Sequence, residues 1–291
     1  MTLQAAPGEW LRGRRLLLKR EDGHELGAFK WRGALPVVER YREQGHASVV
    51  TASTGNHGAA AAWAAARHGM TAVVFVPERA SAAKLELLRG LGAELVVGGA
   101  DLDEAKSAGI EHARSQGLPF FQDGAEPAQY EGYGAIADEI LADETPDAVL
   151  VPVGNGALLA GIGLRLGLRS PATRRIGVVA AGAPVMARSF DAGHVVESSQ
   201  SGTFADGMAV RVAIPVAVEV LATAADQMAE VSDREIAEAG IRVEGSAAAA
   251  LAGARRLEGR LEGVVVLIVT GRNIDDDLWQ RAVERPESFS G

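Results

Sequence analysis

The sequence of 291 residues contains no cysteine, which excludes disulfide bonds, thiolate ligands for metals and a cysteine nucleophile. A chain without cysteine suits a reducing compartment, and we expect a cytoplasmic protein. Long hydrophobic runs are absent as well. None approaches the roughly 20 apolar residues that a membrane-spanning helix needs. The first fifteen residues also lack the basic-then-apolar order of a signal peptide. We therefore expect no membrane partner.

Positive charge is scarce, since 29 lysines and arginines face 38 aspartates and glutamates, for a formal net charge of −9. Nucleic acids and anionic membranes are bound by clustered lysine and arginine, so the charge balance argues against both as partners. A hydrophobic content of 47% and a charged content of 23% are those of an ordinary globular protein. The length suffices for one large domain or two medium ones.

Short β-rich runs alternate with longer helical runs along much of the chain. We expect strands at residues 48–52, 71–77, 94–97, 118–122, 148–153, 175–180 and 263–269. We expect helices at residues 58–68, 81–91, 101–116, 130–141, 157–166, 233–243 and 246–256. Such alternation with short turns predicts right-handed crossovers and parallel sheets covered on both faces.

The fold class is therefore α/β, with two open, twisted, mostly parallel sheets flanked by helices. We expect a large domain from residues 1–45 and 130–291, and a small α/β domain from residues 46–129. Ligands in such sheets bind at the carboxyl ends of the strands, and the glycine-rich turns of this sequence lie at those ends.

A lysine, Lys30, follows a small-residue turn in the segment Gly27-Ala28-Phe29-Lys30-Trp31-Arg32-Gly33. Most lysines are solvent-exposed side chains, but a desolvated lysine can act as a Schiff-base nucleophile. Soon after it, Ser53-Thr54-Gly55-Asn56-His57-Gly58 separates a strand-like run from a helix-like run. Gly154-Asn155-Gly156-Ala157 has the same setting. Backbone N–H groups at such turns can bind an anion, although each turn alone is also an ordinary strand-to-helix connection.

In this order, the motifs resemble those of the fold type II, or tryptophan synthase β-like, enzymes that use pyridoxal phosphate (PLP). Within that family they resemble the serine/threonine dehydratase and threonine synthase branches, from about Arg15 to Asp275. The resemblance implies that PLP is the cofactor and that it lies in the cleft between the two lobes. It also implies that Lys30 forms the Schiff base and removes the α-proton of the substrate.

The resemblance assigns further residues by position. Gly154, Asn155, Gly156 and Ala157 match the loop around the cofactor phosphate, and Asn56 matches the asparagine on the 3′-oxygen. Ser53, Thr54, Gly55, Asn56 and His57 match the loop that receives the substrate carboxylate, although His57 is also typical of a structural histidine. Thr270 matches the hydroxyl residue that faces the pyridine nitrogen. A neutral hydroxyl there makes a weaker electron sink, which suits elimination and replacement.

Two further stretches resemble the dehydratase branch, although both could serve packing alone. They are residues 203–210 and 243–248. Val179 stands where metal-activated relatives carry a glutamate ligand, so we predict no metal site. Ala28 replaces the usual serine before Phe29, which leaves the identity of the substrate open. We expect no regulatory domain after Asp275.

These features favour a PLP-dependent lyase, an ammonia-lyase that eliminates the β-hydroxyl of an amino acid such as L-threonine or L-serine. A threonine synthase-like or other β/γ-replacement enzyme is the alternative, suggested by residues 130–133 and 151–156. An amino-acid racemase rests on Thr54 alone, because racemases carry a serine there. A PLP-binding protein that has lost catalysis also stays open. A dinucleotide-binding protein lacks support, because no Gly-x-Gly-x-x-Gly follows the first strand. The resemblance further implies a homodimer.

Overall fold

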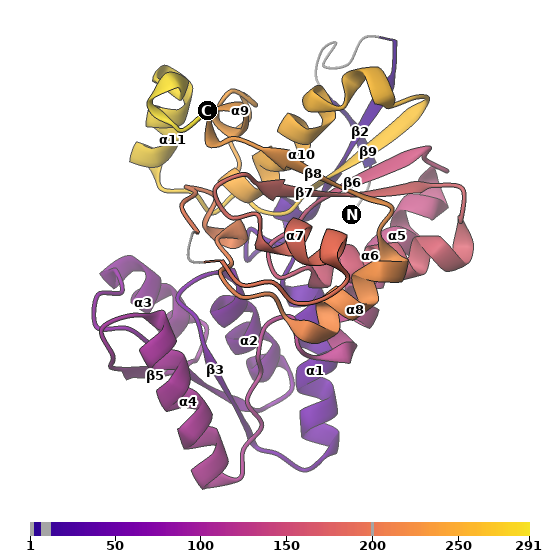
Figure 1. The fold of residues 1–291 in the computed structure, drawn as a ribbon. Coiled ribbons are helices and arrows are strands. Elements are labelled where there is room, and N and C mark those ends of the chain that lie inside the picture. Colours follow the sequence, from indigo (N-terminus) through magenta and orange to yellow (C-terminus); the bar gives the residue numbers. More distant parts are fainter. Residues whose placement is uncertain (1–2, 7–12, 199–200) are drawn as a thin grey trace. The chain divides into compact units, whose positions relative to one another are not determined.

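The computed structural model describes residues 3–6, 13–198 and 201–291. By its contacts the chain divides into two compact units. Figure 1 shows the chain coloured by residue number. The larger unit comprises Met1–Phe29 and Tyr133–Gly291, and the smaller unit comprises Lys30–Gly132. The domain boundaries drawn from the sequence, at 45/46 and 129/130, stay predictions.

The larger unit is built on a six-stranded sheet with the order β1-β2-β9-β6-β7-β8. Its strands are β1 (Leu3–Ala5), β2 (Arg15–Arg20), β6 (Ala148–Pro152), β7 (Arg174–Ala180), β8 (Gln227–Val231) and β9 (Val264–Val269). All neighbours pair in parallel except β1 and β2, which are antiparallel. β6 and β9 are apolar at nearly every position because both faces of a central parallel strand are buried.

Helices cover both faces of this sheet. They are α6 (Ala157–Arg169), α7 (Val185–Ala192), α8 (Pro215–Ala224), α9 (Asp233–Ala237), α10 (Gly245–Arg256) and α11 (Asp276–Glu284), with 3₁₀ turns η1 (Glu21–Gly23), η2 (Asp206–Met208), η3 (Glu258–Arg260) and η4 (Pro286–Ser288). A Cβ on Gly253 of α10 would lie 2.6 Å from Val178, whereas a Cβ on Gly177 would lie 2.8 Å from Leu159 of α6. Consecutive strand residues face opposite sides, so α10 and α6 pack on opposite faces, as Figure 1 shows.

A buried lysine of strand β2 is neutralised inside the larger unit. The Lys19 ammonium donates to Glu21 at 2.9 Å and to Glu139 at 2.6 Å. Glu139 belongs to α5 (Pro127–Asp143), and both Lys19 and Glu21 are fully buried. A buried charge is tolerated only when it is paired, so these three side chains depend on one another.

The smaller unit contains a three-stranded parallel sheet with the order β3-β4-β5. Its elements are α1 (Trp31–Glu43), β3 (Ser48–Ala52), α2 (Asn56–Arg67), β4 (Thr71–Val76), α3 (Ala82–Gly90), β5 (Glu94–Val97) and α4 (Leu102–Gln116). The Asp101 carboxylate caps α4 by accepting from the N–H groups of Asp103 and Glu104. Asp101 precedes two acidic residues in the first turn, as the sequence predicts for the positive end of the dipole.

The predicted α/β fold with parallel sheets is confirmed, but two predicted elements are wrong. The strand expected at residues 118–122 is reduced to a single bridge between Val50 and Phe120. Pro119 lacks an N–H group and cannot continue a regular ladder there. The helix expected at residues 233–243 ends at Ala237, and Gly240 has a φ of +75°, outside the helical region. Within the described residues, no helix is long and apolar enough to cross a membrane.

Candidate active site

Lys30 lies at the start of helix α1 in the smaller unit, where its carbonyl accepts the Ala34 N–H at 3.0 Å. Its side chain is 18% exposed, and its ammonium forms an ion pair with the carboxylate of Asp123. A lysine that is mostly buried and paired with a carboxylate is not a solvent-exposed surface lysine. The position therefore fits a reactive amine whose charge a neighbouring carboxylate balances.

Asp123 is itself fixed by its own neighbours. Its second oxygen accepts the Gln129 side-chain amide at 3.0 Å and lies 3.6 Å from His57 Nδ1. Gln129 in turn accepts the Gly124 N–H at 2.7 Å. Burial alone would raise the pKa of Asp123, but the charges of Lys30 and His57 and two hydrogen bonds outweigh it and hold that pKa well below its usual range. Asp123 is therefore ionised at neutral pH.

His57 is a buried part of the same cluster. Its Nε2 lies 3.0 Å from the Thr51 hydroxyl and 3.2 Å from the Phe121 carbonyl oxygen. Burial lowers the pKa of His57, with Asp123 acting in the opposite direction. The Thr51 hydroxyl donates to the same Phe121 carbonyl oxygen at 2.9 Å, so Thr51, His57 and Phe121 form one buried cluster. The structural character predicted for His57 is consistent with these contacts, and the side chain also borders Asp123.

The turn from Ser53 to Asn56 connects β3 to α2 in the same unit. The Gly55 N–H donates to the Ser53 hydroxyl at 3.1 Å, and α2 starts at Asn56. A Cβ on Gly58 would lie 2.5 Å from the Ser53 carbonyl oxygen, so the turn closes tightly over the helix. The first N–H groups of a helix have no carbonyl partner within it and can receive a carboxylate. Lys30, Asp123, His57 and this turn all belong to the smaller unit.

In the larger unit, the loop from Gly154 to Gly156 connects β6 to α6. A Cβ on Gly154 would lie 2.2 Å from the Gly207 carbonyl oxygen, so glycine is required for this close approach. Gly156 has a φ of +92°, which favours glycine, and the Asn155 side chain accepts the Ala157 N–H at 3.1 Å. The loop therefore places backbone N–H groups at the positive end of α6, a helix of 13 residues. Such N–H groups can bind the oxygens of a phosphate group.

Thr270 follows the last residue of β9 and is 2% exposed. Its hydroxyl donates to Glu244 at 3.1 Å, and its carbonyl accepts the Phe29 N–H at 3.0 Å. β6 and β9 pair with Leu150 opposite Leu267, so Thr270 and the loop at Gly154 leave the same edge of the sheet. This carboxyl edge is where parallel sheets bind ligands.

Sequence reasoning did not single out two of the residues at these positions. Asp123 follows the irregular segment that contains Pro119, and no motif distinguishes it from other surface-type acids. Glu244 lies in the stretch 243–248, whose resemblance could be explained by packing. Both carboxylates contact a residue that the sequence had singled out, Lys30 and Thr270 respectively.

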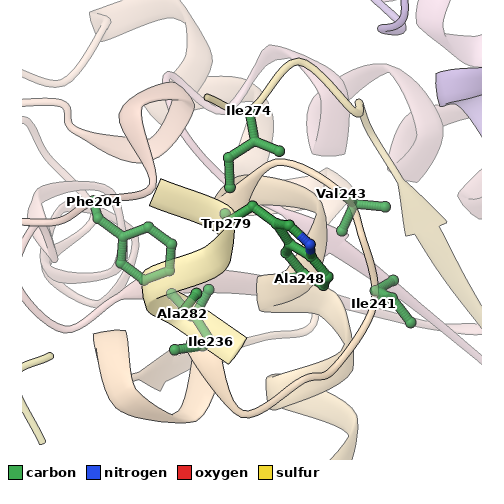
Figure 2. Close-up of a pocket in the computed structure, with 10 residues that line it drawn as sticks. Phe204, Ile236, Ile241, Val243, Ala248, Ile274, Trp279 and Ala282 are labelled. Atoms are coloured by element: carbon green, nitrogen blue, oxygen red, sulfur yellow. The ribbon is translucent and has the colours of Figure 1, made fainter. Parts of the chain in front are cut away.

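One other cavity of the larger unit is too small to hold an amino acid. An apolar pocket under α11, lined by Phe204, Ile274 and Trp279 among others, is shown in Figure 2. Its free volume of about 10 Å³ has room for about one water molecule, which excludes an amino acid. The described part of the chain also holds no group of three or more histidine, cysteine, aspartate or glutamate side chains placed to bind a metal.

Comparisons with known proteins identify a matching family model and several similar proteins. The family model described as pyridoxal-phosphate dependent enzyme matches residues 3–271. An L-threonine ammonia-lyase from Geobacter sulfurreducens is 34% identical over 282 residues, which cover 93% of this chain and 70% of that protein. The chain is also similar to several curated biosynthetic L-threonine dehydratases, but it spans only about two fifths of the length of those proteins.

Two solved structures are similar over nearly the whole chain. The processed form of threonine deaminase isoform 2 from Solanum lycopersicum has a TM-score of 0.89 and 30% identity, covering 97% of this chain and 88% of that chain. Maize serine racemase has a TM-score of 0.88 and 26% identity, covering 98% of this chain and 92% of that chain.

Proposed function

The chain belongs to the family of pyridoxal-phosphate-dependent enzymes, and from that premise we propose that it is an ammonia-lyase for a hydroxy amino acid. The observation that carries the proposal is the mostly buried Lys30 held by Asp123, next to the turn that opens α2. The similarity to the L-threonine ammonia-lyase of Geobacter sulfurreducens, over 93% of this chain, supports L-threonine or L-serine as the substrate.

The residues of this chain would divide the binding tasks between them. Lys30 would hold the cofactor covalently, and the backbone of Gly154, Asn155, Gly156 and Ala157 would bind its phosphate. Asn56 would donate to the 3′-oxygen, and Thr270 would face the ring nitrogen. The geometry of the Gly154 loop supports the phosphate assignment, because a helix N-terminus stabilises a dianion. Bound PLP supplies an electron sink for the negative charge that develops at the substrate Cα.

Lys30 would then serve as the acid and base of the elimination. Its neutral amine, freed when the substrate binds, takes the proton from Cα and becomes an ammonium, which Asp123 stabilises. That ammonium returns a proton to the β-hydroxyl, which leaves as water. Release of the product would restore the bond between Lys30 and the cofactor, and the freed enamine would then hydrolyse in water to a 2-oxo acid and ammonia. The hydroxyl and N–H groups from Ser53 to His57 would hold the substrate carboxylate.

Serine racemisation is a second candidate, favoured by the similarity to maize serine racemase. Racemisation needs a proton donor on the face of the substrate opposite Lys30, and Thr54 is the residue proposed for it.

We also propose a homodimer located in the cytoplasm. Sedimentation of the purified protein tests the dimer.

Incubation of the purified protein and PLP with L-threonine, L-serine and O-phosphohomoserine tests the function. We expect 2-oxo acid and ammonia from the hydroxy amino acids, and neither from a Lys30→Ala variant. Phosphate release from O-phosphohomoserine without oxo-acid formation would instead identify a replacement enzyme. Formation of D-serine alone would identify a racemase.

A further inference from the structure

The segment before Lys30 pairs with the loop that follows β9. The Phe29 N–H donates to the Thr270 carbonyl at 3.0 Å, and the Arg272 N–H donates to the Gly27 carbonyl at 2.9 Å. An antiparallel bridge lies between these two bonds. The segment and the loop therefore form a short ladder inside the larger unit, and the ladder ends one residue before the reactive lysine.

A side chain of the same loop fixes the turn that precedes the ladder. The Gly27 N–H closes this turn on the His24 carbonyl at 2.8 Å. The Asn273 side-chain amide donates to the Leu26 carbonyl of the turn at 2.9 Å. Gly27 has a φ of +68°, which favours glycine, and a Cβ there would overlap the Asn273 side-chain oxygen. The missing side chain at Gly27 thus lets Asn273 lie directly against the turn.

The start of the turn is tied to the same loop and to strand β2. The Arg272 guanidinium donates to the Asp22 carbonyl and, at 3.5 Å, to the His24 carbonyl. The Asp22 carboxylate is buried and accepts both the Nε and the NH2 group of Arg20, the last residue of β2. A shift of the turn would therefore break several hydrogen bonds at once.

The position of this backbone matters because Lys30 follows it directly. In the proposed function the Lys30 amine bonds the cofactor and later takes the proton from the substrate Cα. A base has to come within about 3 Å of the proton that it removes. A misplacement of roughly 1 Å can lower the rate about a hundredfold. The ladder also ends on Thr270, the residue proposed to face the cofactor ring nitrogen.

We propose that Asn273 is a positioning residue, which holds the backbone before Lys30 and so keeps Lys30 and Thr270 at a fixed spacing. The inference rests on the proposed function, in which these two residues meet different parts of the bound cofactor. Asn273 acts through the backbone of the turn, and this role needs no contact with the cofactor or the substrate.

Asn273→Asp tests the role, because a carboxylate has the shape of the amide but cannot donate to the Leu26 carbonyl. Gln116→Glu makes the same change at an exposed side chain of α4 and is the matched control. The first measurement is hydrogen exchange of the cofactor-free proteins, followed by mass spectrometry. In Asn273→Asp we expect the peptide with residues 24–29 to exchange roughly two- to tenfold faster, as for the loss of one hydrogen bond. Gln116→Glu should match the wild type.

The second measurement uses the enzyme loaded with PLP and L-serine as substrate. The kcat is expressed per bound PLP, so that a mere loss of folded protein leaves it unchanged. In Asn273→Asp we expect this kcat to fall roughly tenfold, because the Lys30 amine is less well placed. The turn proposed to hold the substrate carboxylate starts at Ser53 in the smaller unit, so KM should stay within about twofold of the wild type.

The outcomes separate this inference from the proposed function. Unchanged exchange of residues 24–29, or an unchanged kcat per bound PLP, overturns the role of Asn273 and leaves the lyase proposal standing. A wild-type protein that binds PLP but forms no 2-oxo acid overturns the lyase proposal. The fraction of PLP that borohydride fixes on Lys30 then replaces kcat, and an unchanged fraction in Asn273→Asp overturns the role of Asn273. If Asn273→Asp does not fold, Asn273→Ala removes the donor without adding a charge, and the same measurements decide.

Discussion

The ammonium of Lys30 and the carboxylate of Asp123 form an ion pair across 93 residues of sequence. One oxygen of Asp123 pairs with Lys30, and the Gln129 side-chain amide donates to the other oxygen. The pair joins the start of α1 to the segment that follows the bridge at Phe120. Asp123 is thereby placed to stabilise Lys30 whenever that amine carries a proton.

Removing the charge of Asp123 should destabilise the cofactor-free protein. Asp123→Asn removes the carboxylate that pairs with the mostly buried Lys30 ammonium, and we expect a loss of about 1–3 kcal/mol in the free energy of unfolding at pH 7. Denaturation with urea, followed by circular dichroism, measures it. Equal stability of the variant and the wild type at pH 7 would mean that the pair contributes nothing.

The same substitution should change the pH dependence of stability. The pKa of Asp123 is lower in the folded protein than in the unfolded chain, so the pair stabilises fully above about pH 4. That contribution is lost as the pH falls through the folded-state pKa. The difference between wild type and Asp123→Asn should therefore be constant from pH 5 to 7 and shrink below pH 4. A difference that grows on acidification would contradict the ionised state of Asp123.

Substitution of the buried Lys19 should be more costly than that of other lysines. Lys19→Met removes the ammonium that pairs with the fully buried Glu21, and we expect a loss of about 3–5 kcal/mol in the free energy of unfolding. Lys84→Met, in α3, is the matched control and should cost no more than about 0.5 kcal/mol. Chemical denaturation of both variants measures the loss in the free energy of unfolding. Similar losses for the two variants would contradict a stabilising role of the ion pairs that Lys19 forms with Glu21 and Glu139.

The Gly154 loop should not tolerate a side chain at its second glycine. At a φ of +92°, alanine in place of Gly156 is strained by about 1–3 kcal/mol, and its Cβ would lie 2.8 Å from Met186. We expect Gly156→Ala to bind PLP at least tenfold more weakly in an absorbance titration. Gly259→Ala has open space around the new Cβ and should bind like the wild type. Unchanged affinity of Gly156→Ala would remove the loop from the cofactor site.

Thr54 should act on substrate binding if its hydroxyl holds the carboxylate. A lost hydrogen bond to a charged group costs about 1.5–3 kcal/mol, so Thr54→Ala should raise KM at least about tenfold with a smaller change in kcat. Thr54→Ser keeps the hydroxyl and should restore KM. A loss of D-serine formation with normal oxo-acid formation would assign Thr54 to racemisation instead.

Much of the fold was predictable because the central strands are uniformly apolar. β6 and β9 occur where their apolar runs placed them. β2 was not predicted, because arginines and Lys19 flank the apolar run Leu16–Leu18 and conceal a strand whose lysine is neutralised by the nearby Glu21 and by Glu139, 120 positions away. Pairing of this kind depends on tertiary structure, which local patterns do not contain.

The candidate site was predictable where motifs are local, and not where a partner comes from elsewhere in the chain. Lys30 and the Gly154 loop are marked by adjacent glycines and small residues. Asp123 and Glu244 gain their significance only from side chains 93 and 26 positions away. The assignments to cofactor and substrate stay predictions until they are measured.

Peptide mapping by mass spectrometry, after the protein has been incubated with PLP and reduced with borohydride, locates the covalent link directly. Modification of the peptide that contains Lys30, and its absence from those of Lys19 and Lys84, is the expected result. A cofactor fixed on another lysine, or no modified peptide, would contradict the role given to Lys30 and with it the proposed chemistry.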